Sequence, residues 1–201
     1  MNKEKIIKSY EQNRYTVQWF DKIEDATEYL AAQIKGKSVG FGDSQTMMKM
    51  QLHEILEKEN MVYDPLPTKD NDEFLAVAKQ CLTSDIFLTS VNAATEEGIL
   101  LNMDGTGNRI AGSLFGHEKV YFILGTNKLA SNLDEAIWRV RNIAAPLNAK
   151  RLNLKTPCAI HGDKCYNCSS SDRICNGLII HYKKMNDIEM EVIFIDDDLG
   201  Y

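Results

Sequence analysis

The sequence has few prolines and no long run of apolar residues. Only 4 of its 201 residues are proline. No apolar stretch approaches the roughly 20 residues that a helix needs to cross a membrane. The chain also contains no internal repeat and no low-complexity linker. These absences argue against a membrane-spanning or repeat protein, and they favour one globular domain over residues 1–201.

Basic residues are also in the minority. The chain carries 23 Lys and Arg against 29 Asp and Glu, which gives a formal net charge of -6 at pH 7. Its basic residues form no long cluster, and binding to nucleic acid needs a basic surface, so we expect no nucleic-acid partner. The first residues, MNKEK, lack the apolar core of a signal peptide. We therefore expect a cytoplasmic location.

Apolar runs alternate along the chain with segments in which apolar residues recur every three or four positions. The first pattern predicts buried strands and the second predicts helices. Their alternation is typical of βαβ units, so we predict an α/β fold of three layers, a mainly parallel sheet with helices on both faces. The predicted strands are residues 15–20, 38–42, 61–64, 86–89, 99–103, 119–124, 178–182 and 191–195. The predicted helices are residues 3–12, 21–36, 47–58, 71–82, 108–115 and 132–146, the last of which Pro146 should end or kink.

A glycine-containing turn follows the strand predicted at residues 38–42. The segment reads Gly40-Phe41-Gly42-Asp43-Ser44-Gln45-Thr46. A strand, a glycine turn, hydroxyl side chains and a helix start together direct backbone N–H groups toward an anion above the turn. The spacing matches neither a Walker loop nor a dinucleotide fingerprint, and an N-capped helix after a tight turn is the alternative interpretation. The residues predicted to bind the anion are Gly40, Gly42, Ser44 and Thr46.

The polar stretch between the strands at residues 86–89 and 119–124 is the second candidate binding segment. It contains two adjacent acids, Glu96 and Glu97, and the run NMDGTGNR at residues 102–109. Polar residues at strand ends are where α/β proteins usually bind ligands, and we expect this segment and the glycine turn to converge at one edge of the sheet. Tight turns would explain the glycines but not the paired acids. The predicted ligand-binding residues here are Asn92, Asn102, Asp104, Asn108 and Arg109.

Four of the five cysteines lie within a Cys-rich loop at residues 155–176. Their spacing is Cys158-x6-Cys165-x2-Cys168-x6-Cys175. A Cys-x2-Cys pair is a common metal clamp, and the two flanking cysteines would complete four ligands for zinc or an iron–sulfur cluster. The x6 spacings match no standard zinc finger, so reduced or reversibly oxidised thiols and structural disulfides remain alternatives. The fifth cysteine, Cys81, is predicted to be a buried apolar residue.

These segments together resemble the LUD domain family, which is associated with lactate utilisation and was once described as a domain of unknown function. The resemblance covers about residues 20–201 and is close to the compact, single-domain members. We therefore expect no counterpart of the ferredoxin-like part found in the larger iron–sulfur component of the lactate oxidation system. The matching segments are GFGDSQT at 40–46, NAATEEGILLNMDGTGNR at 92–109, FGHEKV at 115–120, VRNIAAPLNAKRLN at 140–153, TPC at 156–158 and RICN at 173–176.

The resemblance implies a fold like that of the ribose-5-phosphate isomerase, CoA transferase and formyltetrahydrofolate cyclo-ligase group. In that group, residues 40–46 are similar to the isomerase loop that holds a sugar phosphate. Residues 95–98 are similar to the Ser-Glu-Asn-Gly motif whose glutamate is the CoA transferase nucleophile, although Glu97 stands where the motif has Asn. The resemblance thus implies that Glu96 is a catalytic nucleophile, and a carboxylate beside an acyl or enediol substrate could equally act as a general base. A capping or loop-ordering acid is the alternative.

Three functions follow as hypotheses. The first is a component of lactate or related organic-acid utilisation that binds a small anionic substrate or cofactor at the two polar segments. The second is a non-catalytic ligand- or metal-binding subunit that docks onto iron–sulfur or other redox proteins, because no dinucleotide fingerprint is present. The third is a phosphosugar isomerase-like or acyl-transfer enzyme that uses Glu96. A homo-oligomer is compatible with each of them.

Overall fold

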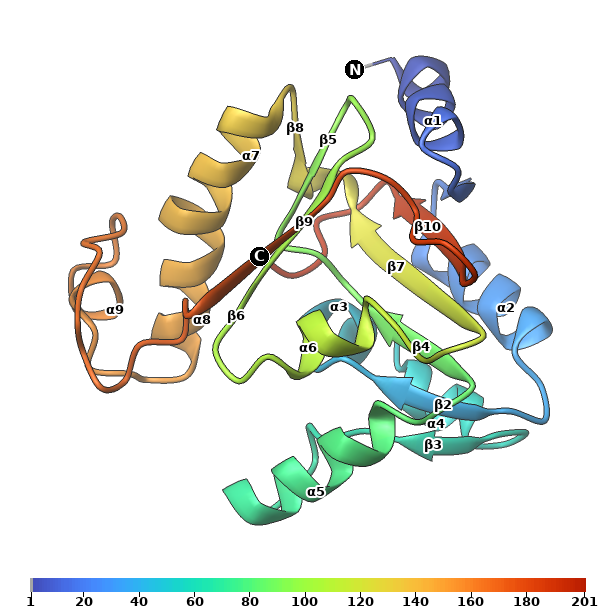
Figure 1. Cartoon of the computed structure of the whole chain (residues 1–201), viewed down its shortest axis with the longest axis horizontal. Coiled ribbons are helices and arrows are strands. Elements are labelled where there is room, and N and C mark those ends of the chain that lie inside the picture. The colour runs from blue at the N-terminus through green and yellow to red at the C-terminus, as the bar shows by residue number, and fades with distance from the viewer. Residues whose placement is uncertain (1) are drawn as a thin grey trace.

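The computed structural model describes residues 2–201, which form two β-sheets (Figure 1). The first sheet has six strands, all parallel, in the order β1-β10-β7-β4-β2-β3. The parallel sheet that the sequence predicts is therefore confirmed. Its strands are β1 (Thr16–Phe20), β2 (Ser38–Phe41), β3 (Met61–Tyr63), β4 (Ile86–Thr89), β7 (Lys119–Gly125) and β10 (Glu189–Ile195).

A second, smaller sheet lies beside the first and is not predicted by the sequence. Its order is β8-β5-β6-β9, with β5–β6 and β6–β9 antiparallel and β5–β8 parallel. Only four residues, 96–99, join β5 to β6, and so short a connection allows a hairpin but not a parallel crossover. The strands are β5 (Ala93–Thr95), β6 (Leu100–Asp104), β8 (Leu129–Ala130) and β9 (Gly177–His181).

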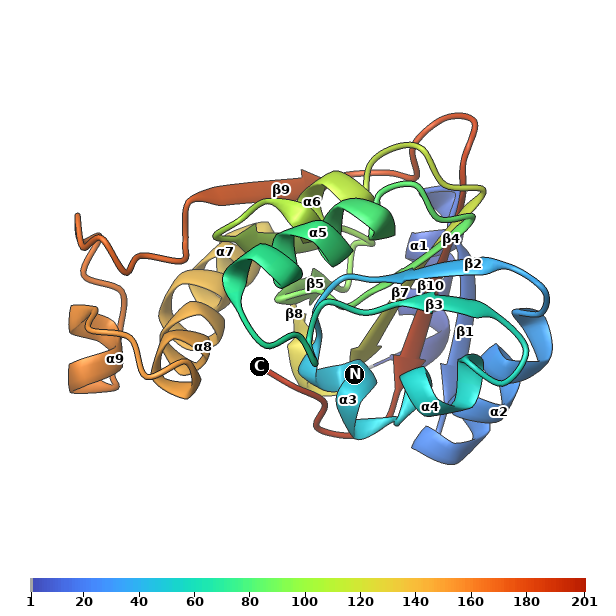
Figure 2. The same ribbon diagram turned by 90° about the horizontal axis from the view of Figure 1, so that it is seen from below.

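Helices cover both faces of the first sheet, as the two perpendicular views show (Figures 1 and 2). The helix predicted at residues 47–58 is divided, because Gln51 adopts a left-handed conformation with φ of 53°. Within residues 2–201, no helix is long and apolar enough to cross a bilayer. The helices are α1 (Lys3–Gln12), α2 (Ile23–Gln33), α3 (Gln45–Lys49), α4 (Leu52–Leu56), α5 (Asn71–Cys81), α6 (Asn108–Gly112), α7 (Leu133–Arg139), α8 (Ala145–Arg151) and α9 (Pro157–His161), with a 3-10 turn η1 (Thr126–Lys128) and a π-helical turn η2 (Val140–Ala144).

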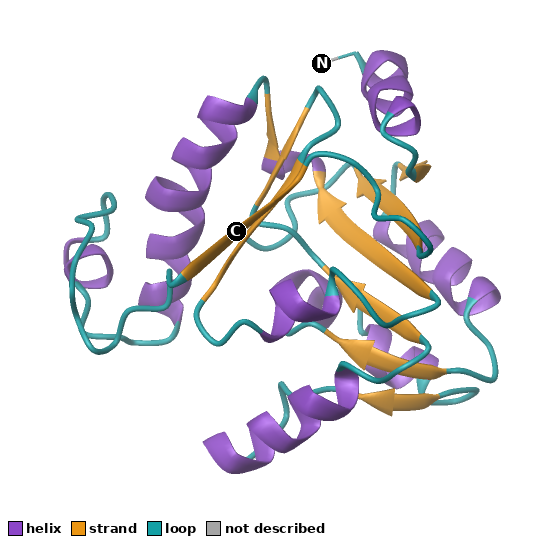
Figure 3. Ribbon diagram, in the orientation of Figure 1, coloured by secondary structure: helices purple, strands orange, loops and turns teal. Residues whose placement is uncertain are grey.

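Three apolar clusters hold these layers together. On one face of the first sheet, α2, α3 and α4 pack against β2, β4, β7 and β10. On the other face, α1, α5 and the second sheet share a cluster that includes Tyr10, Cys81 and Phe122. A third cluster joins the second sheet to α7. The second sheet is therefore enclosed between the first sheet and α7, an arrangement visible in Figure 3.

The long helix predicted from residue 132 neither ends nor breaks at Pro146. Instead, α7 continues through the wide turn η2 into α8, with Pro146 in the first turn of α8. Proline has no N–H to donate and its ring crowds the preceding turn of an α-helix, so a π turn before it relieves that clash. The helical column consequently remains continuous from Leu133 to Arg151.

Candidate functional site

A cavity of about 140 Å³ opens at the carboxyl ends of the parallel strands. Ser44 follows β2, Ser90 follows β4 and Lys128 follows β7, and all three line this cavity. The open end of the β5–β6 hairpin contributes Asn92 and Asp104. These segments lie far apart in the sequence, and they meet because the carboxyl ends of parallel strands share one edge.

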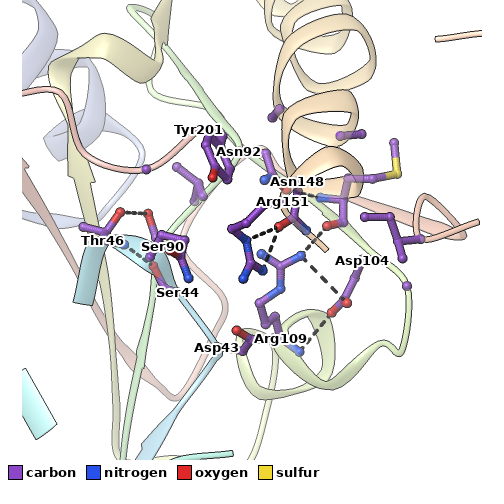
Figure 4. A pocket seen from close by; sticks show the side chains of 18 of the residues that line it. Asp43, Ser44, Thr46, Ser90, Asn92, Asp104, Arg109, Asn148, Arg151 and Tyr201 are labelled. Carbon is purple, nitrogen blue, oxygen red and sulfur yellow. Dashed lines mark hydrogen bonds and ion pairs between the residues drawn. The ribbon is translucent and has the colours of Figure 1, made fainter. Parts of the chain in front are cut away.

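Two helices supply the opposite wall of the cavity. Arg109 comes from α6, and Asn148 and Arg151 come from α8 (Figure 4). The Nε and Nη2 atoms of Arg151 donate to Oδ1 of Asn148 at 3.0 and 2.9 Å. This pair of bonds fixes the plane of the Arg151 guanidinium beside the cavity.

Asp104 orders the side of the cavity formed by α6. Its Oδ2 accepts hydrogen bonds from the backbone N–H groups of Arg109 (3.0 Å) and Ile110 (3.3 Å), at the start of α6. Its Oδ1 lies 3.8 Å from Nη2 of Arg109, so one carboxylate both caps the helix and pairs with the guanidinium. Asp104 is only 5% exposed, and it therefore acts as a fixed anchor for Arg109.

Hydroxyl groups form the floor of the cavity. Ser44 is the N-cap of α3, and its Oγ accepts from the backbone N–H of Thr46 at 3.2 Å. The Thr46 hydroxyl is fully buried and lies 3.3 Å from Oγ of Ser90. It also lies within 3.4 Å of the carbonyl oxygen of Leu199, which can accept its proton.

Lys128 is a buried cation on this floor. Its side chain is 3% exposed, and Nζ donates to Oγ of Ser90 at 2.9 Å and to Oγ1 of Thr46 at 3.4 Å. Among residues 2–201, no carboxylate pairs with Nζ. Burial, together with the positive charges of Arg139 and Arg109, lowers the pKa of Lys128 to about 7. A buried lysine without an acidic partner is uncommon, and such groups concentrate at functional sites.

Asp43 brings a second titratable group to the cavity. Burial raises the pKa of its carboxyl above the usual range, while Arg109 and Arg151 act in the opposite direction. The cavity thus brings three basic side chains, Arg109, Arg151 and Lys128, together with two acidic ones, Asp43 and Asp104.

Six of the ligand-binding residues predicted from the sequence meet in this cavity, and three lie behind it. A Cβ at Gly40 would approach the Cys81 carbonyl oxygen to 2.7 Å, and one at Gly42 would approach Oγ1 of Thr89 to 2.8 Å, so these glycines serve packing within the sheet and against α5. Asn102 is 1% exposed and donates to the Ser90 carbonyl oxygen at 3.0 Å, which supports Ser90 from behind. The six that line the cavity are Ser44, Thr46, Asn92, Asp104, Asn108 and Arg109.

Glu96 does not reach the cavity. It lies in the turn between β5 and β6, at the opposite end of the hairpin from Asn92 and Asp104. Its backbone N–H donates to the Ala130 carbonyl oxygen at 3.0 Å. The expectation that the glycine turn and the paired acids converge in one cavity is wrong, because a hairpin places its turn and its open end at opposite ends of the strands. We assign Glu96 no role in this cavity.

Several cavity residues escape the sequence prediction. Ser90 follows β4 directly, and Lys128 ends the turn η1 that follows β7, so the rule that selects Ser44 after β2 would also have selected them. Asn148 and Arg151 sit on a helix whose orientation toward the cavity depends on tertiary packing. Nothing in the sequence pattern alone identifies that pair.

The Cys-rich loop follows α8 in the chain. It includes the short helix α9, which packs against α8. Cys158, Cys165, Cys168 and Cys175 are all unpaired thiols of intermediate exposure. Burial raises the pKa of the Cys175 thiol, Arg173 lowers it, and the neighbouring Cys165 and Cys168 raise it. Across residues 2–201, no three His, Cys, Asp or Glu side chains are grouped so that they could hold an ion. The zinc or iron–sulfur site stays a prediction, which metal analysis of the purified protein would test.

The fold and the cavity together define an α/β domain with a charged pocket at the carboxyl edge of a parallel sheet. The chain belongs to the LUD domain family, whose sequence profile matches residues 3–195. That family is associated with lactate utilisation. A crystal structure of a DUF162 family protein from Deinococcus radiodurans is similar, with a TM-score of 0.51 and 13% sequence identity over 97% of this chain and 99% of that chain. This likeness supports the fold. No curated protein matches the sequence.

Proposed function

We propose that the protein binds a small organic anion in this cavity, as a component of lactate or related organic-acid utilisation. The observation that carries the proposal is Lys128, a buried amine that lacks an acidic partner and lies at a cavity. Burying an ammonium group is costly unless an opposite charge compensates it. An anion in the cavity would provide that compensation.

The remaining polar groups suit a carboxylate. A guanidinium group offers paired N–H donors that match the two oxygens of a carboxylate, and Arg109 and Arg151 both line the cavity. The hydroxyl groups of Ser44 and Ser90 can bond to a hydroxyl or carbonyl oxygen next to that carboxylate. A short 2-hydroxy or 2-oxo acid carries this combination of groups.

The size of the cavity agrees with such a ligand. Its volume is about 140 Å³. An engineered protein cavity of about 150 Å³ holds benzene, a molecule of about six heavy atoms. Lactate and pyruvate have the same number of heavy atoms, and the association of the LUD domain family with lactate utilisation supports acids of this class.

Isothermal titration calorimetry would test the proposal with L-lactate and pyruvate as ligands and lactamide as the uncharged control. We expect both acids to bind the wild-type protein and lactamide to bind far more weakly. Lys128→Met should weaken binding of the acids roughly 10- to 150-fold, because hydrogen bonds to charged groups contribute about 1.5–3 kcal/mol.

Lys79→Met is the matched control, since Lys79 is exposed on α5 and away from the cavity. It should bind both acids as the wild type does. The proposal fails if neither acid binds, or if Lys128→Met binds them as tightly as Lys79→Met.

A further inference from the structure

We propose that Lys128 attacks the carbonyl carbon of a short 2-oxo acid held in the cavity and forms an imine with it. This inference rests on the anion site proposed above and adds a covalent reaction to it. It assigns 2-oxo acids as the ligand class that reacts, whereas 2-hydroxy acids would bind without reacting.

The hydrogen bonds around Nζ favour a nucleophilic amine. Ser90 Oγ and Thr46 Oγ1 lie 2.9 and 3.4 Å from Nζ and can accept the two N–H bonds of a neutral amine. The Thr46 hydroxyl can itself donate to the carbonyl oxygen of Leu199, so it remains free to accept from Nζ. The nitrogen lone pair then has no hydrogen-bond partner of its own and is available to a ligand in the cavity.

The surroundings of Lys128 also keep much of the amine neutral. Burial lowers its pKa to about 7, and Arg139 and Arg109 act in the same direction. An exposed lysine has a pKa near 10.4, so at pH 7 Lys128 has a neutral fraction roughly a thousandfold larger. Desolvation and a neighbouring cation are the two means by which proteins activate a lysine for attack on a carbonyl.

The guanidinium groups orient the ligand for this reaction. Arg109 and Arg151 line the cavity together with Lys128, and the charge of Arg109 reaches Lys128 strongly enough to lower its pKa. A carboxylate bound by these arginines would bring its adjacent carbon toward the amine. In a 2-oxo acid that carbon is the carbonyl carbon, and holding it beside the nucleophile removes much of the entropic cost of the reaction.

The reaction balances without an oxidant or a reductant. The Nζ lone pair forms the C–N bond while the electrons of the C=O π bond move to oxygen. One proton then passes from nitrogen to that oxygen and gives a carbinolamine. The hydroxyl group leaves with the second nitrogen proton as water, and a C=N bond remains.

Borohydride trapping tests the inference. Wild-type protein would be treated at pH 7 with pyruvate and sodium borohydride, digested and analysed by peptide mass spectrometry. We expect a reduced pyruvate adduct on the peptide that contains Lys128, at least about tenfold more abundant than any adduct on the exposed Lys79, because a larger share of Lys128 is neutral. L-lactate in place of pyruvate should give none. Because the adduct is mapped in the wild-type protein, the result does not depend on a variant folding.

The outcomes separate this inference from the anion site itself. If pyruvate binds in calorimetry but borohydride traps no adduct on Lys128, the imine is disproved and the anion site stands. An adduct on exposed lysines alone would disprove it equally. If neither acid binds and no adduct forms, both proposals fall. NMR in D₂O gives a second readout, because an imine makes the methyl protons of pyruvate acidic. The wild-type protein should accelerate the exchange of these protons for deuterium, and Lys128→Met should not.

Discussion

The two ends of the β5–β6 hairpin are both polar, but one end lines the cavity and the other packs against α1. The open end carries Asn92 and Asp104 and lines the cavity, while the turn carries Glu96 and Glu97 and rests against α1. In Figure 1 the turn lies near α1, and the other end of β6 leads toward α6. Fewer than about ten residues of chain separate these groups, but extended strands carry them to opposite ends of the sheet.

The partners of the polar groups explain the difference. At the open end, the Asn92 side chain accepts from the Met103 N–H at 2.7 Å and fixes the strands beside a group of cations. At the turn, the hydroxyl of Tyr10 donates to the Thr95 carbonyl oxygen at 3.1 Å, and Nδ2 of Asn13 donates to the Gly98 carbonyl oxygen at 2.9 Å. The turn therefore has its backbone carbonyl groups bonded to α1 and the residue that follows it, whereas the open end places charged side chains at the cavity.

The largest effect at the open end should be the dependence of anion affinity on pH. Lys128 has a pKa of about 7, so the affinity for L-lactate should be highest below pH 7 and fall as the pH rises and the ammonium is lost. The ammonium fraction falls from about one half at pH 7 to about one hundredth at pH 9, so the affinity can fall by up to roughly 50-fold over that range. Calorimetry from pH 6 to pH 9 would measure this, and a flat profile would contradict it.

Replacing Arg109 at the open end should have the next largest effect. Arg109→Gln removes a guanidinium that Asp104 holds beside the cavity, and we expect L-lactate affinity to fall about tenfold. Arg14→Gln is the control, because Arg14 bonds Asn186 and Lys184 at the surface and does not line the cavity. Equal affinities in the two variants would show that Arg109 does not contact the anion.

A substitution at the turn should change stability rather than binding. Tyr10→Phe removes the buried hydrogen bond to the Thr95 carbonyl oxygen and should lower the free energy of unfolding by about 1 kcal/mol. Urea unfolding would measure that loss, and calorimetry should show L-lactate affinity within about twofold of wild type. A clear loss of affinity in this variant would mean that the turn and the open end are coupled.

Glu96→Gln is expected to give the smallest effect. Glu96 lies at the turn, where its backbone N–H donates to the Ala130 carbonyl oxygen at 3.0 Å. Both the affinity for L-lactate and the yield of trapped pyruvate adduct should stay within about twofold of wild type. A loss comparable to that of Arg109→Gln would return Glu96 to the functional site.

The hairpin also shows which parts of the molecule could be predicted from the sequence. Apolar runs identify β4, β7 and β10, and Ser44 can be selected because it follows a strand of the parallel sheet, whose carboxyl ends meet at one edge. The two-residue strand β8 and the second sheet depend on pairing between distant segments, which leaves no periodic signal. The position of Lys128 after β7 could be predicted, but its burial could not, because that burial depends on Thr46 and Ser90 packing around it.

Gly40 and Gly42 show the opposite difficulty. Their pattern suggests backbone contact with a ligand. In the structure, the missing side chain instead lets the end of α5 pack close to Gly40 and β4 pack close to Gly42. In a sequence, a glycine that makes room for a ligand cannot be distinguished from one that makes room for a neighbouring helix or strand. Only the packing around them separates the two uses.

The π-helical turn η2 determines which face of α8 is directed toward the cavity. In an α-helix each residue advances about 100° around the axis, so one added residue turns everything downstream by that angle while the axis keeps its course. Deleting a single residue between Val140 and Ala144 would thus swing Asn148 and Arg151 away from the ligand without dismantling the column. A single-residue deletion in η2 would thus change which side chains of α8 face the cavity, and with them the ligand that the cavity binds.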